Sequence, residues 1–251
     1  MEGNGAEEGR LMSVSRAEIF RNIRLALAKP ALTQHDGHHE TAADAEQLFR
    51  SASAKDHLIE KFQTEFELVS GEFFRASSNE DAVRSLCELI QSAGVQTVAI
   101  SDHAICEHLQ LRKILQTALP EIQVYQESID SESSYERRHL KRTLSHSQLS
   151  VTGAEFLIAE SGTFVVIAGT QASRQISLLP DIHVVLATPQ QIYPNLAEAF
   201  QVIQKEGRTH PGSAITLITG PSRTADIEKV LIKGVHGPTR IVTIMLDASL
   251  A

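Results

Sequence analysis

From about residue 53 onward, this 251-residue chain alternates amphipathic stretches with short apolar runs. Residues 54–69 carry apolar side chains at helical spacing, and residues 95–100 form an apolar run of the kind found in strands covered on both faces. The pattern predicts strands at 72–76, 95–100, 122–126, 182–187, 214–219 and 241–246, and helices at 54–69, from 78, 104–118, 135–146, 194–204 and 224–232. This alternation predicts a mostly parallel sheet with helices on both faces.

One segment departs from that alternation. Two apolar runs, 156–159 and 164–168, are separated by only four residues with a glycine at position 162. Such spacing is typical of a β-hairpin.

The first 46 residues differ from the rest. Ser15 and Glu18 match a helical capping box. The apolar stripe that follows predicts an amphipathic helix, which Pro30 ends. Residues 31–46 are polar and include His35, His38 and His39, which suit either a metal site or a solvated linker. We therefore expect an N-terminal helical arm and linker at 1–46 and one domain at 47–251.

Composition excludes several classes of function. The net charge of −8 and the absence of Trp disfavour nucleic-acid binding. The one basic cluster, Arg137, Arg138, Lys141 and Arg142, is interpreted as a solvated helix face. There is no apolar run of the roughly 18–20 residues that a membrane span needs, and no apolar signal segment at the N-terminus. The prediction is a cytoplasmic protein without a transmembrane segment.

The two cysteines, Cys87 and Cys106, lie far apart and in apolar stretches. They cannot supply the four thiolates of an ordinary iron–sulfur cluster, and no spaced histidine pair predicts another metal site. No cofactor is therefore expected on this chain, and any cluster would belong to a partner.

The segment 219–228 is the most informative candidate site. It follows a predicted strand and precedes a predicted helix, and helix N-termini bind carboxylates and phosphates. Gly220 would allow close backbone approach, and Arg223 could pair with an anion through two N–H groups. The alternative is a purely structural helix start, with Ser222 or Thr224 as N-cap and Asp226 complementing the helix dipole.

Three further segments carry candidate chemistry. Glu155 and Glu160 flank the predicted hairpin, where a desolvated carboxylate could act as base or nucleophile. Arg174 precedes an apolar run and suits pairing with a carboxylate. His236 and Gly237 join the last helix to the last strand, where His236 could carry a proton.

Three ordered segments carry a resemblance to a known family. They are residues 152–163, Arg174 with 177–180 and the strand after them, and residues 218–228 with 234–238. Together they resemble the LUD-domain family, in its LutC/YkgG type. The sequence departs from the family pattern at Glu155, where Asp is usual, and at Ser161, where Thr is usual.

The resemblance implies an α/β three-layer sandwich related to ribose-5-phosphate isomerase (RpiA), glucosamine-6-phosphate deaminase (NagB) and CoA transferases. It also implies a place in a bacterial system of three proteins that oxidises L-lactate to pyruvate. The expected partners are two Cys-rich iron–sulfur proteins and a small anion, lactate or pyruvate. Candidate catalytic residues are Glu160, Asp226 and His236; candidate substrate-binding residues are Arg174, Gly220, Ser222, Arg223, Thr224 and Gly237.

Two other hypotheses remain open from the sequence. One is a stand-alone enzyme of the CoA-transferase or formyltetrahydrofolate cyclo-ligase kind, with Glu160 as nucleophile. The other is an assembly subunit without chemistry that docks through its N-terminal arm.

Overall fold

The computed structural model describes residues 52–127, 142–168, 173–205, 214–224, 232–233 and 237–247. The predicted arm at 1–46, including its three histidines, lies outside the described residues, as do Arg137, Arg138 and Lys141 of the basic cluster.

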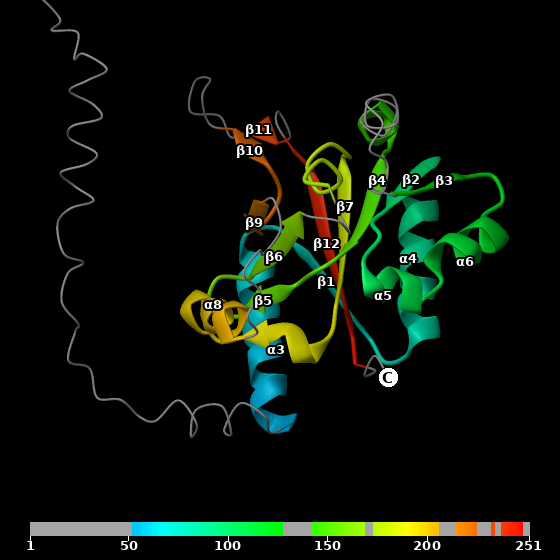
Figure 1. The fold of residues 1–251 in the computed structure, drawn as a ribbon. Helices are drawn as coiled ribbons and strands as arrows, with labels where there is room; N and C mark the ends of the chain where they lie inside the picture. Colours follow the sequence, from blue (N-terminus) through cyan, green and yellow to red (C-terminus); the bar gives the residue numbers. More distant parts are fainter. Residues whose placement is uncertain are drawn as a thin grey trace, which may run out of the picture. The chain divides into compact units, whose positions relative to one another are not determined.

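The largest sheet has six parallel strands in the order β1-β12-β7-β4-β2-β3 (Figure 1). The strands are β1 (Glu72–Ala76), β2 (Thr97–Ile100), β3 (Gln123–Gln126), β4 (Leu149–Gly153), β7 (Ile182–Ala187) and β12 (Arg240–Leu246). β4 and β7 in the middle are buried almost throughout, as expected for parallel strands covered on both faces. The predicted α/β sandwich with a mostly parallel sheet is confirmed.

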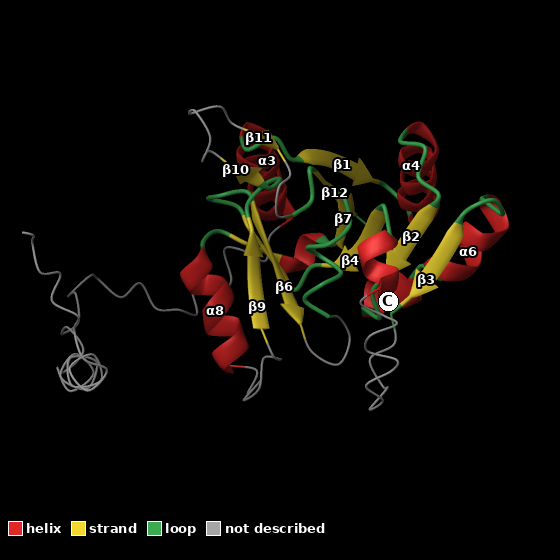
Figure 2. Ribbon diagram, turned by 90° about the horizontal axis from the view of Figure 1, so that it is seen from above, coloured by secondary structure: helices red, strands yellow, loops and turns green. Residues whose placement is uncertain are grey.

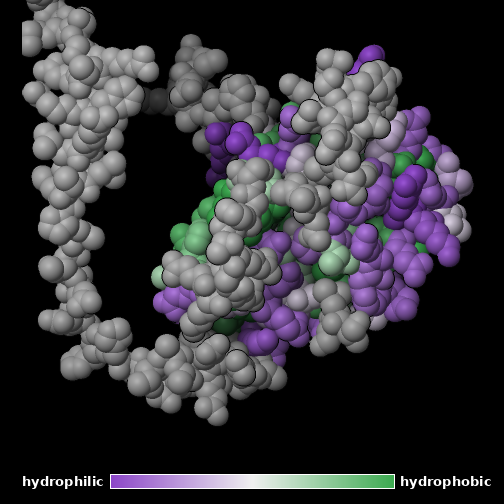
Figure 3. Space-filling model, in the orientation of Figure 1, coloured by the Kyte–Doolittle hydropathy of each residue, from purple (hydrophilic) through white to green (hydrophobic). Residues whose placement is uncertain are grey.

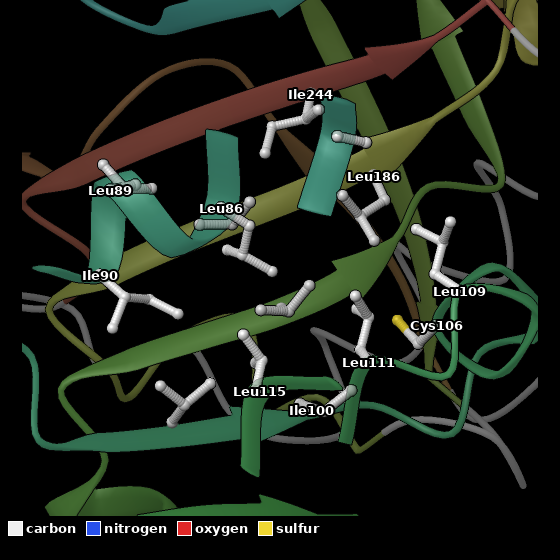
Figure 4. Close-up of a cluster of buried hydrophobic side chains, with 14 of the residues drawn as sticks. Leu86, Leu89, Ile90, Ile100, Cys106, Leu109, Leu111, Leu115, Leu186 and Ile244 are labelled. Atoms are coloured by element: carbon white, nitrogen blue, oxygen red, sulfur yellow. The ribbon is translucent and has the colours of Figure 1, made fainter. Parts of the chain in front are cut away.

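One face of this sheet is covered by α4 (Asn79–Ser92), α5 (Ala104–His108) and α6 (Leu111–Ala118). Leu86 and Ile90 of α4 and Leu115 of α6 pack with alternate residues of the central strands, such as Leu186 and Ile244 (Figure 4). Because side chains alternate across a strand, the residues between them point to the opposite face.

The opposite face is covered by α3 (Ala52–Leu68) and by a smaller mixed sheet. That sheet has the order β8-β5-β6-β9, formed by β5 (Phe156–Ile158), β6 (Thr163–Ala168), β8 (Ile192–Tyr193) and β9 (Ala214–Ile218). Phe62 and Phe66 of α3 and Phe164 of β6 fill the space between the sheets. The outer side of the small sheet is covered by α8 (Leu196–Lys205), on the opposite side of the molecule from α4 and α6 (Figure 2).

The predicted hairpin is confirmed, since β5 and β6 pair antiparallel. Two other expectations are wrong. The helix expected at 104–118 is two helices, α5 and α6, separated at Gln110, which adopts the left-handed conformation with φ 47°. The strand at 214–218 pairs antiparallel with β6 in the small sheet rather than extending the parallel one.

The expectation of a helix at 224–232 is also wrong at both ends of that range, the parts that the structure describes. Arg223–Thr224 forms β10, which pairs antiparallel with β11 (Ile232–Lys233). The residues between these two strands lie outside the described ranges. The first and last residues of the predicted helix are therefore strand residues that pair with each other.

The core between the two sheets contains one polar pair. Thr152 Oγ1 lies 2.8 Å from His183 Nε2, and Phe164 packs edge-on against the imidazole. Complete burial lowers the pKa of His183 to about 3, so the ring is neutral at physiological pH. Because the ring is neutral, its burial does not carry the large desolvation free energy of a buried charge.

The surface in the orientation of Figure 3 is mainly hydrophilic, with hydrophobic residues gathered near β9. Leu217 of β9 is 44% exposed there. None of the helices in the described ranges combines the length and hydrophobicity that crossing a bilayer demands.

Two glycines with positive φ test how tightly α3 packs on the β5–β6 turn. Gly162 (φ 59°) lies against the backbone of Glu65 and Phe66, whereas Gly94 (φ 63°) ends α4 with open space around its Cα. We expect Gly94→Ala to cost about 1 kcal/mol of unfolding free energy, from backbone conformation alone. Gly162→Ala should cost roughly 1–3 kcal/mol more, from overpacking. Urea unfolding measures both; equal losses would contradict the close packing of α3 on this turn.

Candidate functional site

The order of the parallel strands defines where a ligand site is expected. After β2 the chain adds β3 on one side, and after β4 it adds β7 and then β12 on the other. The direction of growth therefore reverses between the adjacent strands β2 and β4. In open α/β sheets, ligands bind outside the carboxyl ends of the strands at such a switch point.

The loop after β2 places Asp102 and His103 at this point. His103 Nδ1 accepts a hydrogen bond from the backbone N–H of Ile105 at 3.3 Å and caps α5. The ring packs on Gly153, the last residue of β4, where a Cβ atom would collide with it. Burial lowers the pKa of His103 and the nearby Glu155 carboxylate opposes that shift, so the neutral ring is favoured.

The residue after β3 is Glu127, which is only 1% exposed. Its Oε2 accepts the backbone N–H of Ser173 at 3.0 Å. Its other oxygen, Oε1, and the hydroxyl of Ser173 are both buried without a hydrogen-bond partner. Burial raises the pKa of Glu127, the adjacent Ser173 opposes part of that rise, and the Asp102 carboxylate adds a smaller contribution in the direction of burial. The protonated form of this carboxyl group is thus favoured more than in an exposed glutamate, and one of its oxygens is unused.

A groove of about 410 Å³ opens beside these loops. Asp102 and Gln126 line it, and Gln126 Nε2 donates to the carbonyl of Ser101 at 3.1 Å. The remaining lining comes from α5, α6 and the turn between them, namely Cys106, Glu107, Gln110, Leu111, Arg112, Lys113 and Gln116. The volume lies within the range of small-molecule sites. Within the described part of the chain, His, Cys, Asp and Glu side chains form no group suited to hold a metal ion.

The described part of the predicted loop, residues 220–224, lies at the opposite edge of the large sheet. Arg223 Nη2 donates to the Val69 carbonyl at 2.7 Å and to Ser70 Oγ at 2.6 Å, just before β1 begins. Ser222 donates its backbone N–H to the Pro238 carbonyl at 2.8 Å, just before β12 begins. Figure 1 shows β10 and β11 at the end of the molecule opposite the C-terminal end of β12.

The observed contacts of this loop are structural. Ser70 has φ 69°, and α3 ends there with hydrogen bonds from Ser70 to Glu67 and from Gly71 to Phe66. Arg223 therefore adds a cation to a helix C-terminus, where carbonyl groups otherwise lack donors. Gly220 (φ 81°) lies against the same turn, since a Cβ there would approach the Val69 carbonyl oxygen to 2.7 Å.

The structure brings together four of the predicted residues: Gly220, Ser222, Arg223 and Gly237. A Cβ on Gly237 would lie 3.2 Å from the Ser222 Cβ. Of Thr224, only its place in β10 is described. Two predicted catalytic residues, Asp226 and His236, lie outside the described residues.

The remaining two predicted residues lie elsewhere. Glu160 is exposed on the β5–β6 turn, and its Oε1 accepts the backbone N–H of Leu196 at 3.3 Å, at the start of α8. Arg174 is exposed and directly follows Ser173, the partner of Glu127. Among the predicted residues, Arg174 is therefore the one placed next to the carboxyl ends of the parallel strands.

Sequence reasoning missed Asp102, His103, Glu127 and Ser173. Glu127 directly follows a run that was correctly predicted as a strand, and Asp102 and His103 lie two and three positions after another. Examining the first three residues after each predicted parallel strand would have found these three polar residues. Nothing in the sequence pairs Ser173 with Glu127, because the two are 46 positions apart.

Residues 59–246 match the family model of the LUD domain, so the chain belongs to the LUD domain family. The LUD-domain resemblance of the three sequence segments is thereby confirmed.

Among relatives, the Lactate utilization protein C of Oceanobacillus iheyensis is 24% identical over 239 residues, covering 93% of this chain and 98% of that protein. The Uncharacterized protein YkgG of Escherichia coli is 27% identical over 244 residues, with the same coverages. A shorter match, 36% identical over 104 residues, links the chain to the Lactate utilization protein C of Bacillus velezensis; it covers 40% of this chain and 43% of that protein.

A DUF162 family protein from Deinococcus radiodurans, known from a crystal structure, has a similar fold. Its TM-score is 0.52 at 19% identity, and the match covers 76% of this chain and 98% of that one. At this identity the likeness supports the α/β fold and nothing further.

The raised pKa of Glu127 leads to a prediction about stability. Above the usual glutamate pKa of about 4.3 the unfolded chain loses this proton while the folded chain keeps it, so the unfolding free energy falls as pH rises. The fall continues up to the raised pKa of the folded state. Glu127→Gln removes this titrating group. The unfolding free energy of the variant relative to that of the parent chain should therefore be higher at pH 7 than at pH 4. Denaturant unfolding at both pH values, with the exposed Glu121→Gln as control, measures it; parallel pH profiles for parent and Glu127→Gln would contradict the buried acid.

Proposed function

We propose that this chain acts in lactate utilization, as the subunit without iron–sulfur clusters in a system that oxidises L-lactate to pyruvate. The observation that carries the proposal is the match, over 93% of this chain and 98% of the relative, to a protein named Lactate utilization protein C. In this proposal electrons pass to two Cys-rich iron–sulfur partners and on to the respiratory chain, from a cytoplasmic complex.

The environment of the cysteines supports the assignment of the clusters to the partners. Cys106 is buried, and burial raises the pKa of its thiol to about 12. Burial also raises the pKa of the partly buried Cys87 thiol. Iron–sulfur ligation needs thiolates, so neither side chain is suited to it.

The loop from Gly220 to Asp226 is assigned to an anionic group, as its composition predicted. Since its described part, residues 220–224, lies at the edge of the sheet away from the switch point, we assign it to an acidic group of a partner subunit. Arg223 is exposed, and within the described residues its Nε and Nη1 donate to no acceptor. These two donors lie on different edges of the guanidinium, so each is available for a single charge-assisted hydrogen bond to a carboxylate.

Co-expression with the two expected Cys-rich proteins tests the function. The complex should co-purify on this chain and reduce an artificial electron acceptor when L-lactate is added, and omitting this chain should abolish the reaction. A lactate-dependent rate that is unchanged without this chain would contradict the proposal.

The role of Arg223 is tested in the same preparation. Arg223→Ala should lower recovery of the partners by about tenfold, because an interfacial charged hydrogen bond contributes roughly 1.5–3 kcal/mol. Arg84→Ala is the matched control, since Arg84 is exposed on α4 and paired only within its own helix. Unchanged recovery with a folded Arg223→Ala chain would remove this loop from the interface.

A further inference from the structure

We propose that Glu127, Ser173 and Arg174 form a binding site for a small 2-oxo or 2-hydroxy carboxylate at the carboxyl ends of β2, β3 and β4. The choice of pyruvate and lactate as ligands rests on the proposed function; the site itself rests on geometry. It lies at the edge of the sheet opposite the Gly220–Arg223 loop.

The first argument is the pair of unused polar atoms. Glu127 Oε1 and Ser173 Oγ are both buried without a partner, although Glu127 Oε2 and the Ser173 backbone N–H bond to each other at 3.0 Å. Buried polar groups almost always have partners, so two orphans on one hydrogen-bonded pair indicate a missing polar ligand. A carbonyl or hydroxyl oxygen between them would satisfy both.

The second argument concerns charge. Burial raises the pKa of Glu127 against the opposing effect of Ser173, and the Asp102 carboxylate adds to the rise, so the protonated form, which offers an O–H donor to a ligand oxygen, is more populated than in an exposed glutamate. Arg174 is next in the chain to Ser173, is exposed, and makes no ion pair with a described carboxylate. Its guanidinium is the group of choice for the carboxylate of such a ligand.

The third argument is location. The carboxyl and the hydroxyl come from the end of β3 and from the segment before β7, next to the point where strand order reverses. Gln126, next to Glu127 in the sequence, and Asp102, whose carboxylate acts on the pKa of Glu127, line the groove of about 410 Å³, and Ser173 is partly exposed. A molecule of three carbons that enters this groove therefore lies next to the residues that precede and face the pair.

Calorimetric titration of the full chain with pyruvate, L-lactate and acetate tests the site. Pyruvate and L-lactate should bind at least about tenfold more tightly than acetate, which lacks the second oxygen. Arg174→Ala and Glu127→Ala should each weaken pyruvate binding about tenfold or more. Glu127→Gln should stay within about threefold of the parent chain, because an amide N–H replaces the acid O–H as donor. Arg84→Ala, at an exposed position of α4 whose ion pair is within the same helix, should change nothing.

Absence of pyruvate and lactate binding to the parent chain would overturn the site, as would binding that neither Arg174→Ala nor Glu127→Ala weakens in a folded chain. These results differ from failure of the proposed function. If lactate-dependent reduction requires this chain but the chain binds neither acid, the proposed function is supported and the proposed site is wrong. If the chain binds pyruvate through Arg174 while lactate oxidation proceeds without the chain, the proposed site is supported and the proposed function is wrong.

Discussion

Parallel pairing of β4 with β2 on one side and β7 on the other sets the positions of everything else in this domain. β4 is buried along its whole length, so both of its faces pack inside the domain. Leu149 and Val151 enter the core under α4 to α6, and Thr152 pairs with His183 on the other face. The same pairing aligns the carboxyl ends of three strands, which places Gly153 beside His103.

The two edges of the large sheet have separate roles in this structure. At the amino ends, Arg223 and Gly220 hold the last turn of α3, which in turn supports the small mixed sheet. At the carboxyl ends, Glu127 Oε1 and Ser173 Oγ are buried and have no hydrogen-bond partner. The described contacts at the amino ends are therefore structural, whereas the proposed ligand site lies at the carboxyl ends, where open α/β sheets bind ligands.

Much of the fold followed from the sequence, since strands buried on both faces and amphipathic helices leave distinct apolar patterns. The site did not. The segment at 214–218 has the pattern of another parallel strand, yet it pairs antiparallel with β6. Gly220 and Arg223, which follow it, therefore lie near the amino ends of β1 and β12 rather than at the switch point. Strand pairing is a long-range choice that local periodicity does not encode. Likewise, the bond between Glu127 and Ser173 exists only once β3 and the segment before β7 are neighbours.

A crystal structure of the chain grown with pyruvate would test the central claim most directly, because it reports which edge of the sheet holds the ligand. Pyruvate bound with its carbonyl oxygen between Glu127 and Ser173 and its carboxylate on Arg174 is the predicted result. Pyruvate bound at the Gly220–Arg223 loop, with the carboxyl ends of β2, β3 and β4 holding none, would contradict it.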